Sequence, residues 1–232
     1  KKFDQAISLL KETVQGPLFV GDNIITWNRN LSFLREDFFI RYIKNEEIHT
    51  DKRSCIWRLY ILIYFANLAK EIDGDYLELG VLEGNTVEQV VLNLDFKKLN
   101  KKYHLYDLFD WKDNYEHDPH PELKEKDLYK NVCNKFKDCE FINIIKGQVP
   151  DTLKNNLPNK IAFAHIDMNH PEPEEKSLEL ILPKLSKNGI VIFDDYGWWS
   201  YSAQKKALDP IAKENNLSIL ELPTGQGLLI NR

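Results

Sequence analysis

The fold of this chain is decided by one stretch, which reads Gly74-Asp75-Tyr76-Leu77-Glu78-Leu79-Gly80-Val81-Leu82-Glu83-Gly84-Asn85-Thr86. A short, mostly apolar run over 76–79 ends at a glycine, and apolar residues recur at helical spacing over 87–94. This order predicts a buried strand, a tight turn and the beginning of a helix.

The turn in this stretch has the properties of a cofactor-binding loop. Gly80 and Gly84 carry no Cβ atom, so a ligand can approach their backbone closely. The free N–H groups that open the helix at Asn85 and Thr86 favour an anionic group such as a carboxylate or a phosphate. The alternative is that both glycines serve packing, because a G-x-x-x-G turn is not the G-x-G-x-x-G dinucleotide fingerprint.

The composition allows one sizeable core and at most a small appendage, since 43% of the 232 residues are hydrophobic and 12% are aromatic. The net charge is −5, without a concentrated basic face, so we expect no nucleic-acid partner. No apolar run reaches the length of about 20 residues that a membrane span needs, so we expect no membrane partner. Three cysteines without metal-pair spacing suit free thiols in a reducing cytoplasm. The sequence begins at Lys1 rather than Met, which leaves room for an upstream targeting segment.

The first third of the chain predicts a helical domain over residues 1–72. Apolar residues recur at three- and four-residue steps over 3–14, 31–44 and 51–70, which predicts three helices, and a loop with glycine and proline separates the first two. We find no strand pattern here. The domain is either a helical cap packed on the core or a lid over a substrate, and its apolar helices offer a surface for a homodimer.

Residues 73–232 predict the core domain, in which strands and helices alternate. Such alternation indicates an α/β fold with an open, mostly parallel sheet of seven strands and helices on both faces. The expected strands are 76–80, 103–107, 140–145, 161–166, 189–194, 217–222 and 227–231, and the expected helices lie near 86–94, 121–136, 174–186 and 200–215. The connection between the last two strands is too short for a crossover, so the last strand should be antiparallel.

Ligands of such sheets bind beyond the carboxyl ends of the strands, so polar residues there are candidate site residues. Asp107 ends the second expected strand, where a carboxylate can accept hydrogen bonds from both ribose hydroxyls of a nucleotide-like cofactor. Its alternative role is a helix N-cap or a solvated turn. Gly147 and Gln148 follow the third strand, where a glycine and an amide could lie along an adenine edge.

Acidic residues end the next two strands: Asp167 follows the fourth, and Asp194 and Asp195 follow the fifth. Adjacent carboxylates beside a buried strand repel one another unless something neutralises them. Three carboxylates that converge from neighbouring strand ends make an oxygen-rich site that suits Mg²⁺, and no cysteine accompanies them to favour zinc. The alternative for the Asp194-Asp195 pair is one helix N-cap and one surface salt bridge.

Four ordered motifs carry a family resemblance. They are Glu78-Leu79-Gly80 with Gly84, Tyr106-Asp107-Leu108-Phe109, His165-Ile166-Asp167, and Gly189-Ile190-Val191-Ile192-Phe193-Asp194-Asp195-Tyr196-Gly197. Together they resemble the macrocin-type O-methyltransferases, class I enzymes with a Rossmann-like core that use S-adenosylmethionine (SAM) and act on sugar hydroxyls of natural products. The resemblance covers roughly residues 55–232.

This resemblance implies a set of site residues. It implies that SAM contacts the Glu78–Thr86 turn through its methionine part and Asp107 through its ribose. It also implies a Mg²⁺ ion that is held by Asp167, Asp194 and Asp195 and orients the acceptor hydroxyl.

One position departs from the family's pattern. The resemblance implies a second aspartate two residues after Asp167, acting as general base, but this chain has Asn169, and an amide cannot take a proton at neutral pH. His170 is the nearest substitute, because a histidine pKa of about 6.5 suits proton abstraction. It can equally orient the turn before Pro171. The remaining alternatives are that a metal ion alone lowers the pKa of the hydroxyl, that the acceptor needs no base from the protein, or that the chain has lost activity.

Aromatic residues follow the acidic pair and are candidates for the acceptor pocket. Tyr196, Trp198 and Trp199 can form a wall of that pocket, or they can belong to the core. Tyr201 and Lys205 match the Y-x-x-x-K spacing of short-chain dehydrogenases, but the glycine-rich turn that should accompany them is absent. An NAD(P)-dependent reductase is therefore the weaker alternative.

The sequence thus predicts a cytoplasmic, SAM-dependent and Mg²⁺-assisted O-methyltransferase. Its expected small-molecule acceptor is a polar metabolite with a hydroxyl group: a sugar, a glycosylated natural product or a polysaccharide precursor. Because the sulfonium of SAM is already a good leaving group, such an enzyme needs alignment of the reactants rather than a nucleophilic side chain. The alternative that Asn169 suggests is a protein that binds SAM without turnover.

Overall fold

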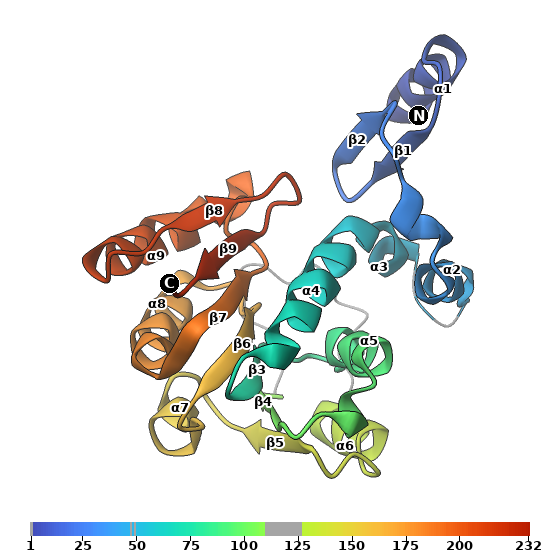
Figure 1. Ribbon diagram of the computed structural model, residues 1–232. Helices are drawn as coiled ribbons and strands as arrows, with labels where there is room; N and C mark the ends of the chain where they lie inside the picture. Colours follow the sequence, from blue (N-terminus) through green and yellow to red (C-terminus); the bar gives the residue numbers. More distant parts are fainter. Residues whose placement is uncertain (1, 47, 49, 110–126) are drawn as a thin grey trace. The chain divides into compact units, whose positions relative to one another are not determined.

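The computed structural model describes residues 2–46, 48, 50–109 and 127–232 (Figure 1). The chain divides into two compact units, Lys1–Ile61 and Leu62–Arg232, and the boundary falls within helix α4 (Ile56–Leu68). None of the helices in the described ranges is both long and apolar enough to span a membrane.

The N-terminal unit combines short helices with a β-hairpin. Its helices are α1 (Lys2–Thr13), α2 (Asp37–Lys44), α3 (Thr50–Ser54) and the first part of α4, with a 3-10 turn at Ser32–Arg35. Strands β1 (Leu18–Gly21) and β2 (Ile24–Trp27) pair antiparallel. The prediction that this region contains no strand is therefore wrong, whereas its role as a cap or lid stays a prediction.

The hairpin forms because its two-residue turn consists of residues that tolerate the required backbone. Asp22 and Asn23 both adopt positive φ angles, 50° and 57°, as a tight type I′ turn demands. Arg58 of α4 donates two hydrogen bonds to the Asp22 carboxylate, at 2.7 and 2.9 Å, and so ties the turn to the helix. An Asp-Asn pair between two apolar runs is the sequence signal for this hairpin.

The C-terminal unit is built on a seven-stranded sheet. Its strands are β3 (Asp75–Leu79), β4 (Tyr103–Asp107), β5 (Ile142–Lys146), β6 (Ile161–Ile166), β7 (Leu185–Phe193), β8 (Ile219–Glu221) and β9 (Gly227–Ile230), in the spatial order β5-β4-β3-β6-β7-β9-β8. Neighbours pair in parallel from β5 to β7, and β9 runs antiparallel to both β7 and β8. The predicted mostly parallel sheet with an antiparallel last strand is confirmed.

Helices cover both faces of this sheet (Figure 1). One face carries α7 (Asp151–Asn156), α8 (Pro171–Ile181) and α9 (Ser202–Glu214), and the other carries α5 (Asn85–Leu94) and α6 (Leu128–Lys135). The first face buries alternate residues of the strands, among them Leu77 and Leu79 of β3, against apolar residues of α7, α8 and α9. Of the predicted helices, the one over 121–136 is observed as α6, and its residues 121–126 lie outside the described residues. Helix α7 was not predicted, because its single buried residue, Leu153, leaves no periodic signal.

The opposite face of the central strand is aromatic. The Tyr76 ring of β3 lies 5.7 Å from the ring of Tyr103 on β4 and 5.3 Å from that of Phe163 on β6. Its hydroxyl donates a hydrogen bond of 2.6 Å to the carbonyl oxygen of Ala66 in α4. This bond attaches the end of α4 to the sheet.

We expect Tyr76→Phe to lower the free energy of unfolding by about 1–2 kcal/mol, because the buried carbonyl of Ala66 would lose its donor. Urea unfolding followed by circular dichroism measures this change. Tyr64→Phe is the matched control, since its side chain is 51% exposed, and should change stability by less than about 0.5 kcal/mol. An equal loss in both variants would contradict the assigned role of the bond.

Candidate functional site

The glycine turn after β3 is shaped by contacts with the chain itself. Gly80 and Gly84 have positive φ angles, 87° and 74°. A Cβ atom on Gly80 would lie 1.8 Å from the carbonyl oxygen of Asp167, and one on Gly84 would lie 2.7 Å from the ring of Phe136. For both glycines the structure therefore supports the packing alternative: the protein's own backbone and an aromatic ring take the space that the missing Cβ atoms leave.

Asp107 holds this turn in place. The Asp107 carboxylate, at the end of β4, accepts hydrogen bonds from the backbone N–H groups of Val81 and Leu82, at 2.6 and 2.8 Å. Its other oxygen accepts one from the N–H of Phe109 at 2.7 Å. A carboxylate offers about four lone-pair sites, so these three bonds leave about one site for the two ribose hydroxyls that the sequence predicts as partners.

The other predicted cofactor residues lie around the same edge of the sheet. Helix α5 begins after Gly84 without a side-chain cap, so the N–H groups of its first turn, at Asn85 and Thr86, are open to an anion. Gly147 follows β5 and donates its N–H to the carbonyl oxygen of Asp107 at 2.9 Å, while the side chain of Gln148 is exposed. The carboxyl ends of β3, β4 and β5 thus form one continuous rim.

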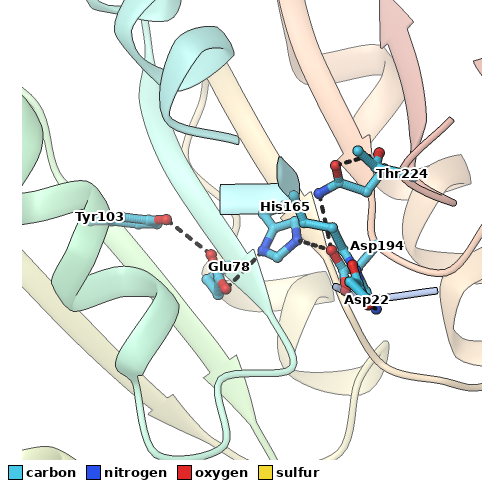
Figure 2. Close-up of polar contacts among 8 residues, drawn as sticks. Asp22, Glu78, Tyr103, His165, Asp194 and Thr224 are labelled. Atoms are coloured by element: carbon cyan, nitrogen blue, oxygen red, sulfur yellow. Dashed lines mark hydrogen bonds and ion pairs between the residues drawn. The ribbon is translucent and has the colours of Figure 1, made fainter. Parts of the chain in front are cut away.

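Glu78 differs from these residues because its carboxylate is buried in the core and not placed at the rim of the sheet. It is 1% exposed and accepts a hydrogen bond of 2.9 Å from the hydroxyl of Tyr103. Its second oxygen lies 2.9 Å from Nδ1 of His165, which is 2% exposed on β6 (Figure 2). Both oxygens of Glu78 thus have partners within the core, and its contact with a cofactor stays a prediction.

The buried pair continues toward the end of β7. Nε2 of His165 lies 3.5 Å from Oδ1 of Asp194, and the side-chain amide of Gln226 donates to the same oxygen at 3.1 Å. Thr224 in turn donates to Oε1 of Gln226 at 2.9 Å, so a chain of contacts runs from the core to the turn between β8 and β9 (Figure 2). His165 belongs to one of the motifs of the family resemblance, but the sequence alone assigns it no role.

The carboxylates around His165 and Asp167 create a negative potential that favours a bound proton or cation. Burial alone would lower the pKa of His165, but the carboxylates of Glu78 and Asp194 outweigh it and raise that pKa well above its ordinary value. Burial, followed by the charges of Asp194 and Asp195, raises the pKa of Asp167 well above its ordinary value. Carboxylates crowded in this way become stable when they share a proton or a cation.

Among the described residues, one group could hold a metal ion, and its members are His165, Asp167 and Asp194. One ligand atom from each lies within 4.8 Å of the others. The structure thus brings together Asp167 and Asp194, as predicted, but Asp195 is not a member of the group. The side chain of Asp195 is buried, and its charge acts on Glu174 of α8, which is also buried.

The predicted catalytic pair lies just beyond this group. Asn169 and His170 are exposed at the turn between β6 and α8, and Asn169 has a φ angle of 55°. His170 directly precedes the first residue of α8 and makes no side-chain cap bond to it. The turn therefore presents both side chains to solvent at the same edge of the sheet as Asp167.

The three residues of the predicted aromatic wall differ in their surroundings, and their role in an acceptor pocket stays a prediction. The hydroxyl of Tyr196 bonds to the carboxylate of Asp209 and to Nζ of Lys205, so these contacts with α9 account for this residue without an acceptor. The ring of Trp198 packs over Gly225, where a Cβ would lie 2.4 Å from the indole nitrogen. Trp199 is 93% exposed, so its ring is open to a large ligand.

A family model described as a methyltransferase domain matches residues 77–196, just over half of the chain, and the chain therefore belongs to that family. The predicted enzyme class, a methyltransferase that uses SAM, is confirmed at this level. A comparison with curated proteins finds no match.

Several solved structures share the fold. The O-methyltransferase NovP aligns with a TM-score of 0.61 and 20% identity, over 76% of this chain and 80% of its own. CalS11, a TDP-rhamnose 3′-O-methyltransferase of calicheamicin biosynthesis, aligns with a TM-score of 0.58 and 18% identity, over 82% and 90%. SAH-bound PaMTH1, a methyltransferase from Podospora anserina, aligns at 0.58 and 13%, over 99% and 94%. At these identities the likeness concerns the fold.

Gly80→Ala should destabilise the protein by about 3 kcal/mol or more, because a Cβ there collides with backbone that cannot move aside. Gly84→Ala should cost less, because the atom it meets belongs to a side chain, the ring of Phe136. Thermal unfolding of both variants measures the difference. A Gly80→Ala protein as stable as the parent would show that the turn is not packed as described.

Glu174 should make stability depend on pH. Burial and the charge of Asp195 raise its pKa from 4.5 to about 8, so the folded protein keeps a proton that the unfolded chain releases. Stability should therefore fall as the pH rises from about 4.5 to 8, and Glu174→Gln should make that fall shallower. Urea unfolding in the presence of EDTA at several pH values measures the slope, and an unchanged slope in the variant would contradict the assignment.

Proposed function

We propose that this protein is a SAM-dependent O-methyltransferase of the macrocin type that acts on a hydroxyl of a small polar metabolite: a sugar, a glycosylated natural product or a polysaccharide precursor. The observation that carries the proposal is the placement of two sites on one edge of the sheet. An anion-accepting helix N-terminus and Asp107 lie at β3 and β4, and the cluster of His165, Asp167 and Asp194 lies at β6 and β7. The sugar acceptor is supported by the similarity of the fold to that of CalS11, a TDP-rhamnose 3′-O-methyltransferase.

The chain's residues suit the parts of SAM. The open N–H groups at the start of α5 can bind the carboxylate of the methionine part, and the remaining lone pair of Asp107 can accept a ribose hydroxyl. When bound, SAM supplies a methyl group on a sulfonium that is already a good leaving group. The work left to the protein is to align the acceptor oxygen with that methyl group and to exclude water.

The acidic cluster suits a divalent cation that orients the acceptor. Asp167 and Asp194 would hold it, and a cation there would lower the pKa of a nearby hydroxyl. We assign His170 as the proton acceptor in place of Asn169. Its side chain is exposed at the turn that precedes α8. The homodimer, the cytoplasmic location and the absence of a nucleic-acid partner stay predictions.

Two other functions are less well supported. Asn169 favours a protein that binds SAM without turnover, and that protein would bind SAM while methylating no acceptor. The reductase alternative requires Lys205 to be available to a cofactor, but its Nζ lies 3.0 Å from both the hydroxyl of Tyr196 and the carboxylate of Glu221. These contacts favour a structural role for Lys205.

The test compares two isosteric variants in binding and in transfer. Asp107→Asn should weaken SAM and S-adenosylhomocysteine binding by about tenfold, since it removes the charge and one acceptor oxygen. Asp194→Asn should leave this affinity within about twofold and lower methyl transfer by about 100-fold or more. Calorimetry measures binding, and mass spectrometry of a panel of nucleotide-linked and free sugars measures transfer. Failure of the parent protein to bind either nucleoside at millimolar concentration would refute the proposal.

A further inference from the structure

The cluster at the ends of β6 and β7 contains a histidine whose ring is arranged as metal-binding imidazoles are. His165 is 2% exposed, and its Nε2 makes no hydrogen bond to the described residues. That atom is directed at the acidic cluster, 3.5 Å from Oδ1 of Asp194 (Figure 2). A buried ring nitrogen without a hydrogen-bond partner is unusual, because buried polar atoms almost always have one.

The other ring nitrogen of His165, Nδ1, is held by a buried carboxylate. Nδ1 of His165 lies 2.9 Å from the carboxylate of Glu78, which the hydroxyl of Tyr103 holds in turn. A carboxylate on Nδ1 keeps the proton on that nitrogen, so Nε2 is the nitrogen that would give up its proton to a cation and then direct its lone pair at the acidic cluster. The same carboxylate–histidine pair stands behind many metal-bound imidazoles, where it orients the ring and raises its basicity.

The spacing of the three groups is close to what one ion requires. Ligands at about 2.1 Å from a shared ion lie at most about 4.2 Å apart. The separation of His165 and Asp194, 3.5 Å, already meets this limit. The full set of ligand atoms lies within 4.8 Å, so a small movement of a carboxylate would complete the site.

We propose that His165 Nε2, Asp167 and Asp194 together bind a first-row transition-metal ion such as Mn²⁺ or Co²⁺ in preference to Mg²⁺, with Glu78 as the residue that positions the imidazole. The preference follows from the donor set, because an imidazole nitrogen suits transition ions better than the hard Mg²⁺ ion, which takes oxygen ligands. Asp195, buried beside Glu174, is left out of the set. The role of this ion in methyl transfer rests on the proposed function, but its binding does not.

The test uses the full chain freed of metal with EDTA. Mn²⁺ is added and followed by electron paramagnetic resonance, and electron spin echo modulation reports any ¹⁴N nucleus bound to the ion. We expect one bound Mn²⁺ with an imidazole ¹⁴N coupling that disappears when the protein is labelled with ¹⁵N-histidine. Because labelling changes no residue, this result does not depend on whether a variant folds.

Variants assign the coupling to one histidine. His165→Gln should abolish it and weaken Mn²⁺ and Co²⁺ binding by about tenfold or more, while Mg²⁺ binding changes less. Glu78→Gln should keep the coupling and weaken Mn²⁺ binding by about tenfold, as loss of a carboxylate behind a metal-bound imidazole does. The matched controls are His170→Gln and His104→Gln. His170 lies at the exposed turn nearby, and His104 lies on β4 beside Asp75. Both variants should retain the nitrogen coupling and the Mn²⁺ affinity.

Three results would overturn the proposal: Mn²⁺ bound without nitrogen coupling, coupling that His170→Gln removes, or no Mn²⁺ binding at millimolar concentration. The first would leave an oxygen-only site, and the third would leave His165 as a charge bridge between Glu78 and Asp194. SAM and S-adenosylhomocysteine calorimetry on the same metal-free protein separates this failure from failure of the proposed function, since nucleoside binding uses the other end of the rim.

Discussion

The contact between Glu78 and His165 is the constraint on which the rest of the site depends. The two residues face each other on neighbouring strands in the middle of the sheet, where neither can be hydrated. A buried charge without its partner costs about 3–5 kcal/mol, so the pair fixes the register of β3 against β6. A slip of β3 by one residue would turn Glu78 away from His165 to the opposite face, which is filled by the apolar core under α7, α8 and α9. Because that register is fixed, Asp167 and the Gly80 turn come to lie beside each other.

A second set of contacts positions the Gly80 turn, on the cofactor side of the rim, relative to β4 and β6. The carbonyl oxygen of Asp167 occupies the place where Gly80 would carry a Cβ atom, and Asp107 binds the two N–H groups that follow. The acidic end of β6 and the acidic end of β4 therefore hold the same turn from two sides. The cofactor loop and the acidic cluster are therefore neighbouring parts of one packed structure.

The sequence predicted most of the sheet, because each strand is a buried apolar run that ends at a polar residue or a glycine. It also predicted that Asp167 and Asp194 would meet, since that follows from the topology of parallel strands. It did not predict the environment of Glu78, because its partner His165 is 87 residues away and only the register brings the two together. Likewise, the glycines indicated a turn without Cβ atoms, but whether a ligand or the chain fills that space is decided by packing. The hairpin of β1 and β2 lies where the sequence predicted a loop, because Asp22 and Asn23 indicate a turn but the four-residue strands on either side are too short to give a clear strand pattern.

The order of β7, β9 and β8 has a consequence for how the protein is made. Strand β9 inserts between β7 and β8, and the turn before it carries Gln226 to Asp194, 32 residues earlier in the chain. During translation, the acidic residues of β6 and β7 leave the ribosome well before Gln226 does. A nascent chain that ends within this interval has an open sheet edge at β7 and an Asp194 that lacks its amide donor. The site is therefore completed late in biosynthesis. When β9 has paired with β7, the edge of β7 is no longer open to other chains.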